Sequence, residues 1–265
     1  MKDKTSTTKV VGKEIVNYFD SVAKDRNYVF SNDKIIEYEQ KMRGKAVLEM
    51  LKAESRDFVL DLGCANGRDL IELSKRGVSN FIGIDVSSEM IVEAKKEFAL
   101  MGISSDKVKI GDAVSLDFRN NVFDKLIASE VIEHIPKVSK AVSEMNRVIK
   151  LGGHLVITTP NRNSWYGFDR IVYKAGLKLF RKKDKHPYDE WKTFSEIKFL
   201  LEENGFKVLE ARGACYAPGF LVLYRMPNII KKLIVSLISK IEPRLSRVFP
   251  KNGYMICVKA QKING

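Results

Sequence analysis

The chain has 265 residues, of which 45% are hydrophobic and 30% charged, with 46 lysines and arginines against 33 aspartates and glutamates. This composition is typical of a globular protein with a sizeable core, and it excludes a disordered, collagen-like or disulfide-dense secreted chain. The first residues lack the apolar segment of a signal peptide, and no apolar stretch reaches membrane-spanning length, so we expect a cytoplasmic protein whose three cysteines are reduced.

The predicted elements alternate along the chain from Phe58 onward. Apolar runs predict strands, amphipathic stretches predict helices, and Thr193 with Glu196 forms a capping box that opens a helix closed by Gly205. The predicted strands are 58–62, 81–85, 108–110, 123–128, 155–159, 206–211 and 254–259, and the predicted helices of the first part are 68–75, 88–101 and 138–149. Strands alternating with helices of this length imply βαβ units and a mostly parallel, doubly wound α/β sheet.

The turn after the first predicted strand reads Asp61-x-Gly63-x-Ala65-x-Gly67. A pyrophosphate-binding turn has the spacing G-x-G-x-x-G and offers backbone N–H groups to phosphates. Here the glycine spacing differs, and the carboxylate of Asp61 would repel a phosphate. A carboxylate beside a turn that admits close approach suits a cationic ligand without phosphate, such as S-adenosylmethionine.

The turn resembles the first motif of the class I S-adenosylmethionine-dependent methyltransferases, D/E-x-G-x-G-x-G, with Ala65 in place of the middle glycine. Three further motifs follow in the family's order, at 85–86, 111–113 and 123–134. The resemblance covers about residues 55–160 and implies a Rossmann-like, seven-stranded, mostly parallel sheet, with a helical N-terminal arm and a helical insertion before the last strand. It also implies the cofactor S-adenosyl-L-methionine.

The resemblance assigns cofactor-binding roles residue by residue. Asp85 would accept hydrogen bonds from both ribose hydroxyls, as a carboxylate does at the same place in dinucleotide folds. Asp112 and Ala113 would contact the adenine. The expected cofactor-binding set is Asp61, Gly63, Cys64, Ala65, Gly67, Asp85, Val86, Asp112, Ala113 and Ser129.

Residues 1–54 are predicted to form a helical arm or lid, and residues 55–265 the methyltransferase domain. Family members fold such an arm over the cofactor, which makes Tyr18, Phe19 and Tyr28 candidates for contact with the sulfonium and Arg43 a candidate for its carboxylate. The alternative is that the three aromatic side chains simply belong to the core of an amphipathic helix.

Three candidate catalytic residues follow from the need for a base near the acceptor. Glu130 and His134 belong to the stretch Glu130-x-x-Glu133-His134, which resembles one in ubiquinone-pathway methyltransferases that can hold a divalent ion. The same stretch lines the cofactor in enzymes without metal, and we predict no metal here. His186 lies in a loop over the expected acceptor site, where a surface histidine is the alternative, whereas His154 reads as structural. Thr159-Pro160-Asn161 should border the acceptor pocket.

The net charge of +13 lies almost wholly in residues 161–265, which carry 21 basic and 9 acidic side chains. Two basic amphipathic insertions, 161–192 and 214–250, are predicted to form the acceptor side. In the second, apolar residues recur at helical spacing, with Lys231, Lys232 and Lys240 off that stripe; the stripe is Ile229, Ile230, Leu233, Ile234, Leu237, Ile238 and Ile241. Such a helix either lies in an anionic membrane interface or packs on the sheet or on a second subunit.

These patterns predict a methyltransferase that acts on a small or lipid-like apolar acceptor of quinone, phenolic or isoprenoid type, with peripheral contact to an anionic membrane. One alternative is an RNA or DNA methyltransferase, which the total charge suggests. It is disfavoured because Ser129-Glu130-Val131-Ile132 offers no proline and no aromatic ring to stack a flipped base. The other is a non-catalytic S-adenosylmethionine-binding module. A homodimer is compatible with the sequence.

Overall fold

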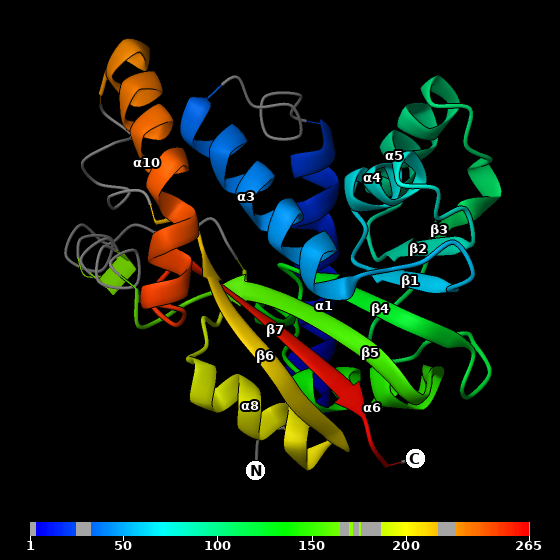
Figure 1. Ribbon diagram of the computed structural model, residues 1–265. Helices are drawn as coiled ribbons and strands as arrows, with labels where there is room; N and C mark the ends of the chain where they lie inside the picture. The colour runs from blue at the N-terminus through cyan, green and yellow to red at the C-terminus, as the bar shows by residue number, and fades with distance from the viewer. Residues whose placement is uncertain are drawn as a thin grey trace.

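The computed structural model describes residues 4–24, 33–164, 170–171, 175, 187–216 and 226–264 (Figure 1). Seven strands form one sheet in the order β3-β2-β1-β4-β5-β7-β6. The strands are β1 (Val59–Leu62), β2 (Phe81–Asp85), β3 (Val108–Ile110), β4 (Phe123–Ser129), β5 (Ile149–Pro160), β6 (Phe206–Ala214) and β7 (Met255–Lys262). Strands β1 to β5 are parallel, and β7 pairs antiparallel with both β5 and β6. This confirms the predicted fold class.

Helices cover both faces of the sheet, and each face has its own core (Figure 1). One layer contains α3 (Lys34–Leu51), α4 (Arg68–Lys75), α5 (Ser88–Leu100) and α10 (Asn228–Val248), and the other contains α6 (Val138–Val148) and α8 (Phe194–Glu203). Aliphatic strand residues are buried toward both layers. The continuous apolar runs of the central strands follow from this arrangement, because a parallel sheet is buried on both faces.

Strand β5 begins six residues earlier than the sequence suggested, at Ile149 instead of Leu155. The pairing of β4 with β5 shifts register between Phe123 and Lys125, and Gly152 has φ +77°. A strand irregularity of this kind uses a glycine for its positive φ. In the sequence, Gly152 and Gly153 look like a turn, which explains the late start of the predicted strand.

Helix starts follow the capping chemistry of the sequence. The Thr193 hydroxyl accepts from the N–H of Glu196 at 3.3 Å, and the Glu196 carboxylate accepts from the N–H of Thr193 at 2.7 Å, so the predicted capping box is confirmed. Asp33 caps α3, and Ser87 caps α5. Each cap satisfies an N–H group that the first helical turn leaves without an intrahelical acceptor.

The N-terminal helix α1 (Lys4–Lys24) lies against the start of α5. The Asp20 carboxylate accepts from the Ser87 hydroxyl at 2.6 Å and from the backbone N–H of Glu89 at 3.3 Å. Val22 packs beside Met90 in a small cluster that also includes Ala65. The arm is therefore anchored at the end of β2 and next to the turn that follows β1.

The described part of the second insertion contains α10, which packs along α3. Its apolar residues divide between two sides: Ile238 is buried and Ile234 partly buried, whereas Ile229, Leu233 and Leu237 are exposed. Most of the first insertion, including Trp165, Phe168, Val172 and Leu179, lies outside the described residues, as does Tyr28. A search of the described helices finds none with the length and apolarity to cross a bilayer.

Candidate functional site

A cavity of about 1490 Å³ opens at the carboxyl ends of the parallel strands. This is where ligands bind in open α/β sheets, at the point where the strand order reverses between β1 and β4. The cavity has a polar half, at the ends of β1, β2 and β3, and a second half between α1, α3 and the ends of β4, β5 and β7. In this second half, which we term the apolar half, apolar side chains lie beside the charged groups of Glu130, Glu133 and Arg43. Apolar-half side chains include Val16, Phe19, Ile36, Val131, Pro160, Trp191, Tyr254 and Met255.

The turn after β1 has a left-handed backbone conformation at three positions. Gly63 has φ +72°, Ala65 φ +46° and Gly67 φ +78°. A Cβ at Gly63 would lie 2.4 Å from Cγ2 of Val131, and one at Gly67 would lie 2.5 Å from Cε1 of Phe98. Only glycine fits these two positions without displacement, because Val131 and Phe98 occupy the space of a side chain, and Gly63 itself lines the cavity.

The carboxylate of Asp85 ties the end of β2 to this turn. It accepts one hydrogen bond from the backbone N–H of Ala65 at 3.0 Å and another from that of Ser87 at 2.9 Å. Burial raises the pKa of Asp85, although these two N–H groups oppose the shift. Each carboxylate oxygen keeps a further lone pair for a ligand, since a carboxylate has about four acceptor positions.

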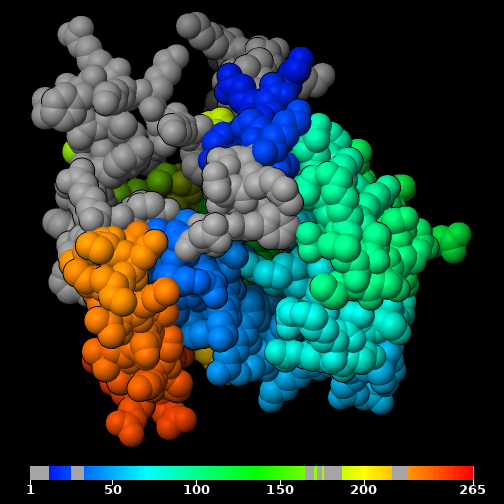
Figure 2. All heavy atoms as spheres, turned by 90° about the horizontal axis from the view of Figure 1, so that it is seen from above, coloured from blue at the N-terminus to red at the C-terminus, as the bar shows by residue number. Residues whose placement is uncertain are grey.

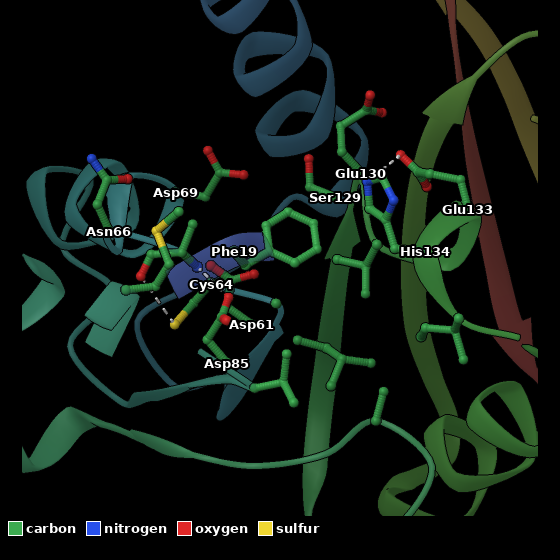
Figure 3. A pocket seen from close by; sticks show the side chains of 18 of the residues that line it. Phe19, Asp61, Cys64, Asn66, Asp69, Asp85, Ser129, Glu130, Glu133 and His134 are labelled. Carbon is green, nitrogen blue, oxygen red and sulfur yellow. Dashed lines mark hydrogen bonds and ion pairs between the residues drawn. The ribbon is translucent and has the colours of Figure 1, made fainter. Parts of the chain in front are cut away.

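Asp61 is 2% exposed and lies among other carboxylates. Burial raises the pKa of Asp61 well above its ordinary value, and the charges of Asp69 and Asp85 raise it further. Figure 3 shows these three carboxylates on the same side of the cavity. A cation bound here would lower the pKa of Asp61 again, because a carboxylate and a cation stabilise each other's charge.

The third strand supplies the remaining edge of the polar half. Asp112 and Ala113 both line the cavity directly after β3, and Val86 lines it after β2. The Asp112 carboxylate accepts from the backbone N–H of Val114 at 3.0 Å, which fixes the loop in a tight turn. Asp112 is exposed at the cavity wall, so its second oxygen remains accessible to a ligand.

At the end of β4, Glu130 has a backbone φ of +59°. This unusual conformation for a glutamate is held by Thr158, whose carbonyl and hydroxyl accept from the Glu130 N–H at 3.0 and 3.2 Å. The Thr158 hydroxyl in turn donates to the Glu130 carboxylate at 3.0 Å and lies 3.1 Å from the hydroxyl of Ser129. A strained backbone that its surroundings hold this firmly is characteristic of functional sites.

Glu133 and His134 follow in a short 3-10 helix and face the cavity (Figure 3). Nδ1 of His134 lies 3.2 Å from the backbone carbonyl of Tyr188. A carbonyl oxygen only accepts, so Nδ1 carries a proton, and in the neutral ring Nε2 carries the lone pair. Nε2 lies 3.9 Å from Oε1 of Glu133, and the His134 ring packs edge-to-face on Phe19 of α1 at 5.1 Å.

Both glutamates have a pKa far above that of an exposed side chain. Burial raises the pKa of Glu130 to about 8, and the charge of Glu133 contributes. Burial also raises the pKa of Glu133 to about 8. Groups that exchange protons near neutral pH are common at catalytic sites. Arg43, on α3, moderates both shifts through its positive charge.

Several buried polar atoms around this group make no hydrogen bond to the described residues. They are Nε of Arg43, Oε2 of Glu133, Oγ1 of Thr159 and Oε1 of Glu39; Glu39 has a further interaction elsewhere in the chain. Buried polar atoms in native proteins are almost always hydrogen-bonded, and exceptions point to a missing ligand or water. The Thr159 hydroxyl lies beside the Glu133 carboxylate and opposes the rise in its pKa that burial causes, so Nε of Arg43 and Oε2 of Glu133, on two residues that line the cavity, are the atoms that a polar group of a ligand would satisfy.

An aromatic wall closes the apolar half. Trp191 packs on Tyr254 at 5.6 Å between ring centroids, and the Arg170 guanidinium lies 4.7 Å above the Trp191 ring. Asp189 pairs with Arg170 and accepts from the Trp191 indole N–H at 3.2 Å. These interactions fix the orientation of Trp191 before a ligand arrives.

The cavity brings together nearly all the site residues expected from the sequence. Gly67 is not part of the cavity lining and is instead the N-cap residue of α4. The side chain of Cys64 packs against Gly83 of β2. His186 lies outside the described residues. Among the residues that the structure describes, no cluster of three or more histidines, cysteines and carboxylates has a metal-binding arrangement.

Sequence reasoning missed Asp69 and the aromatic wall. Asp69 has a recognisable signal, because an acidic residue in the first turn of a helix after a glycine turn is oriented toward the strand ends. Trp191 and Tyr254 come from two segments far apart in the sequence, and Tyr254 immediately precedes β7. Only the antiparallel pairing of β7 with β5 places Tyr254 and Met255 at the mouth of the site.

Comparison with known proteins identifies relatives of this chain. A family model described as a methyltransferase domain matches residues 53–186. Demethylmenaquinone methyltransferase of Staphylococcus aureus is 32% identical over 190 residues, which cover 66% of this chain and 78% of the relative.

Solved structures share the fold at low sequence identity. A S-adenosylmethionine-dependent methyltransferase of Thermotoga maritima has a TM-score of 0.63 at 16% identity and covers 94% of this chain and 99% of its own. One from Mesorhizobium loti has a TM-score of 0.57 at 18% identity and covers 82% and 96%. The cyclase SpnF also has this fold, with a TM-score of 0.56 at 18% identity, 84% of this chain and 80% of its own. Fold alone therefore does not fix the reaction.

Proposed function

Because this chain belongs to the family of class I S-adenosylmethionine-dependent methyltransferases, we propose that it methylates a small or lipid-like apolar acceptor of quinone, phenolic or isoprenoid type. One observation carries this proposal: a single cavity joins a carboxylate-rich polar half to an aromatic and aliphatic half. Ligand pockets usually have volumes of about 300–1000 Å³. At about 1490 Å³, this cavity has room for a cofactor and a second molecule together.

The polar half fits S-adenosylmethionine in shape and charge. Gly63 lines the cavity, and the carboxylates of Asp61 and Asp85 complement a ligand with a sulfonium and an ammonium. When bound, the cofactor supplies a methyl group on a positively charged sulfur, which is transferred by in-line displacement. We assign Asp85 to the ribose hydroxyls, and Asp112 with Ala113 to the adenine.

Arg43 and the N-terminal arm complete the proposed cofactor site. Nε of Arg43 makes no hydrogen bond to a described residue, and an arginine fork suits a carboxylate such as that of the cofactor. Val16 and Phe19 of α1 line the cavity. We propose that residues 1–54 form an N-terminal arm in which α1 is the part that acts as a lid and excludes water, and that residues 55–265 form the catalytic domain.

The apolar half supports an acceptor with a flat, apolar ring. Its wall is made of Trp191, Tyr254 and Met255, which stack and pack on such a ring but offer few hydrogen bonds. The relative from Staphylococcus aureus is named for demethylmenaquinone, which is consistent with a quinone-type acceptor. An acceptor of this type partitions into membranes, so the proposal includes peripheral contact of the protein with an anionic membrane.

His134 is the proposed base. With Nδ1–H donating to the Tyr188 carbonyl, Nε2 is the ring nitrogen that would accept a proton from an acceptor hydroxyl. Loss of that proton makes the oxygen, or the ring carbon next to it, nucleophilic toward the methyl group. Glu133, whose carboxyl lies 3.9 Å from Nε2, would stabilise the resulting imidazolium once it has lost its own proton, which its pKa of about 8 allows near neutral pH.

Glu130 and Thr159 are proposed to position the acceptor. Glu133 lines the cavity with its Oε2 not hydrogen-bonded to a described residue, and the Thr159 hydroxyl lies beside its carboxylate and opposes the rise in its pKa that burial causes. Glu130, with its pKa near 8, holds a proton at neutral pH and is then able to donate a hydrogen bond to an acceptor oxygen. His186, which lies outside the described residues, remains a second candidate base.

The test is a transfer assay with labelled S-adenosylmethionine and three acceptors: a demethylated naphthoquinol, a simple phenol and bulk RNA. We expect label in the naphthoquinol and none in RNA. Calorimetry with S-adenosylmethionine is run alongside. Binding without transfer to either small acceptor would contradict the acceptor class, and transfer to RNA would favour the nucleic-acid alternative.

A further inference from the structure

Helix α10 exposes a row of large aliphatic side chains. Ile229, Leu233 and Leu237 follow each other at four-residue intervals and are 65%, 66% and 64% exposed, with Ile230 and Ile241 beside them. Other large exposed apolar residues, such as Leu100, Leu151 and Phe199, lie on different elements. A contiguous apolar face of this kind usually marks an interaction site, whereas scattered apolar residues do not.

The opposite side of α10 is fixed to the protein by buried polar contacts. Lys231, only 4% exposed, pairs with Asp33 at 2.5 Å, and Glu242 pairs with the Tyr38 hydroxyl and accepts from the backbone N–H of Cys215 at 2.8 Å. A buried charge that loses its partner is strongly destabilised. Rotating the helix to bury the aliphatic row would expose these polar groups. The buried polar contacts therefore keep the aliphatic row on the outer side of α10.

The exposed charges of α10 all have one sign. Lys232, Lys240, Arg244 and Arg247 are exposed and form no ion pair with a described residue, and the helix's one acidic side chain, Glu242, is buried. Helices with exposed aliphatic and basic residues lie flat in the headgroup region of anionic membranes. The aliphatic row and these four basic side chains together form what we term the α10 face.

From this charge complementarity we propose that the α10 face is the surface with which the protein docks on an anionic phospholipid membrane. A second copy of the chain fits less well, because a two-fold contact would bring two sets of basic side chains together without acidic partners. The inference rests on the proposed function, since a lipid-like acceptor would be taken from that membrane.

The position of α10 connects this surface to the cavity. Helix α10 contacts α3 through Lys231–Asp33 and Glu242–Tyr38, and Figure 2 shows the two helices side by side at the surface. Ile36, Gln40 and Arg43 of the same α3 line the cavity. A membrane bound at α10 would therefore lie next to a helix that forms one wall of the acceptor site.

Flotation with vesicles tests the inference on the full-length protein. We expect association with vesicles of phosphatidylcholine and phosphatidylglycerol at low salt, and little with phosphatidylcholine alone. Leu233→Gln with Leu237→Gln should reduce association by about tenfold or more. Replacing Lys240 and Arg244 by glutamine should weaken it about fivefold for each charge and flatten its salt dependence.

The matched controls are Leu100→Gln on α5 and Lys207→Gln on β6, both of which should bind vesicles like the unaltered protein. Calorimetry with S-adenosylmethionine checks that each variant is folded and keeps its cofactor site. Failure to associate with anionic vesicles, or an equal loss in the controls, would overturn the inference. Conversion of a dimer to a monomer by the α10 variants, without vesicle binding, would assign the face to a second copy instead.

The two proposals fail separately. If the protein binds anionic vesicles through α10 but transfers no methyl group to a naphthoquinol, the proposed docking surface stands and the proposed acceptor class is wrong. If the protein methylates the naphthoquinol in detergent but does not bind vesicles, the proposed function stands and the proposed docking surface is wrong.

Discussion

The carboxylate of Asp85 accepts a hydrogen bond from the backbone N–H of Ala65 at 3.0 Å, which joins the end of β2 to the turn after β1. The same carboxylate is the group we assign to the cofactor's ribose. Loss of this side chain should therefore affect both the shape of the turn and ligand binding.

Replacing Asp85 by alanine should weaken S-adenosylmethionine binding by about 10- to 100-fold, because hydrogen bonds to a charged group contribute about 1.5–3 kcal/mol. Calorimetry measures the dissociation constant. Asp117→Ala, an exposed carboxylate outside the cavity, is the control and should bind normally. Equal affinity in the two variants would remove Asp85 from the cofactor site.

Replacing Gly63 by alanine should destabilise the protein by about 3 kcal/mol, from both its positive φ and the overlap of the new Cβ with Val131. Gly77→Ala separates the two causes. Gly77 has a similar φ of +83° but no atom within 4 Å of the place that a Cβ would occupy, so that variant should lose only about 1–2 kcal/mol.

Urea unfolding measures both losses. Adding Val131→Ala to Gly63→Ala should restore part of the stability, because it removes the methyl groups that the new Cβ meets. The idea fails if Gly63→Ala and Gly77→Ala are equally stable.

Unfolding of the cofactor-free protein should depend on pH through Glu130 and Glu133. Their pKa values are about 8 in the folded protein and near 4.5 when unfolded. The folded state therefore binds more protons between these values, and the free energy of unfolding should fall as pH rises from about 5 to about 8. Their contribution is fully present below the lower value and is lost above the upper one.

Glu133→Gln should flatten this slope, since it removes one titrating group and the like charge that raises the pKa of Glu130. The measurement is urea unfolding at several pH values. Glu203→Gln, on the exposed side of α8, serves as the control and should keep the full slope. A free energy of unfolding that rises with pH over this range would contradict the prediction that Glu130 and Glu133 are buried and protonated.

Replacing His134 by alanine should reduce kcat by about 10²–10⁴-fold, the usual contribution of a general base. The affinity for S-adenosylmethionine should change little. His154→Asn, on β5 and outside the cavity lining, should keep its activity. A small effect on kcat would shift the role of base to Glu133 or to His186.

Replacing Trp191 by alanine should raise the KM for the acceptor about tenfold without changing cofactor affinity, because the indole forms much of the apolar wall. Steady-state kinetics with the naphthoquinol measures this split. Phe199→Ala removes an aromatic ring that is 66% exposed on α8 and should leave both constants unaltered.

Local sequence signals were enough to predict which residues form the polar half of the site. The order of strands and helices, the capping box at Thr193 and the glycine turn depend on contacts between near neighbours in the chain. Carboxyl ends of parallel strands meet at one edge, so the sequence alone predicts that Asp61, Asp85 and Asp112 lie together. The tertiary structure adds how Asp85 is held there, through the backbone of Ala65.

The apolar half and the α10 face were decided by tertiary structure. Tyr254 reaches the cavity because β7 pairs antiparallel with β5, and Trp191 because Asp189 and Arg170 hold it there. The sequence placed seven aliphatic residues of α10 on one stripe. Which of them face outward depends on Lys231 and Glu242, whose burial partners, Asp33 and Tyr38, lie about two hundred residues earlier in the chain. Periodicity reveals that a helix has an apolar side, but long-range polar pairing sets the direction in which that side points.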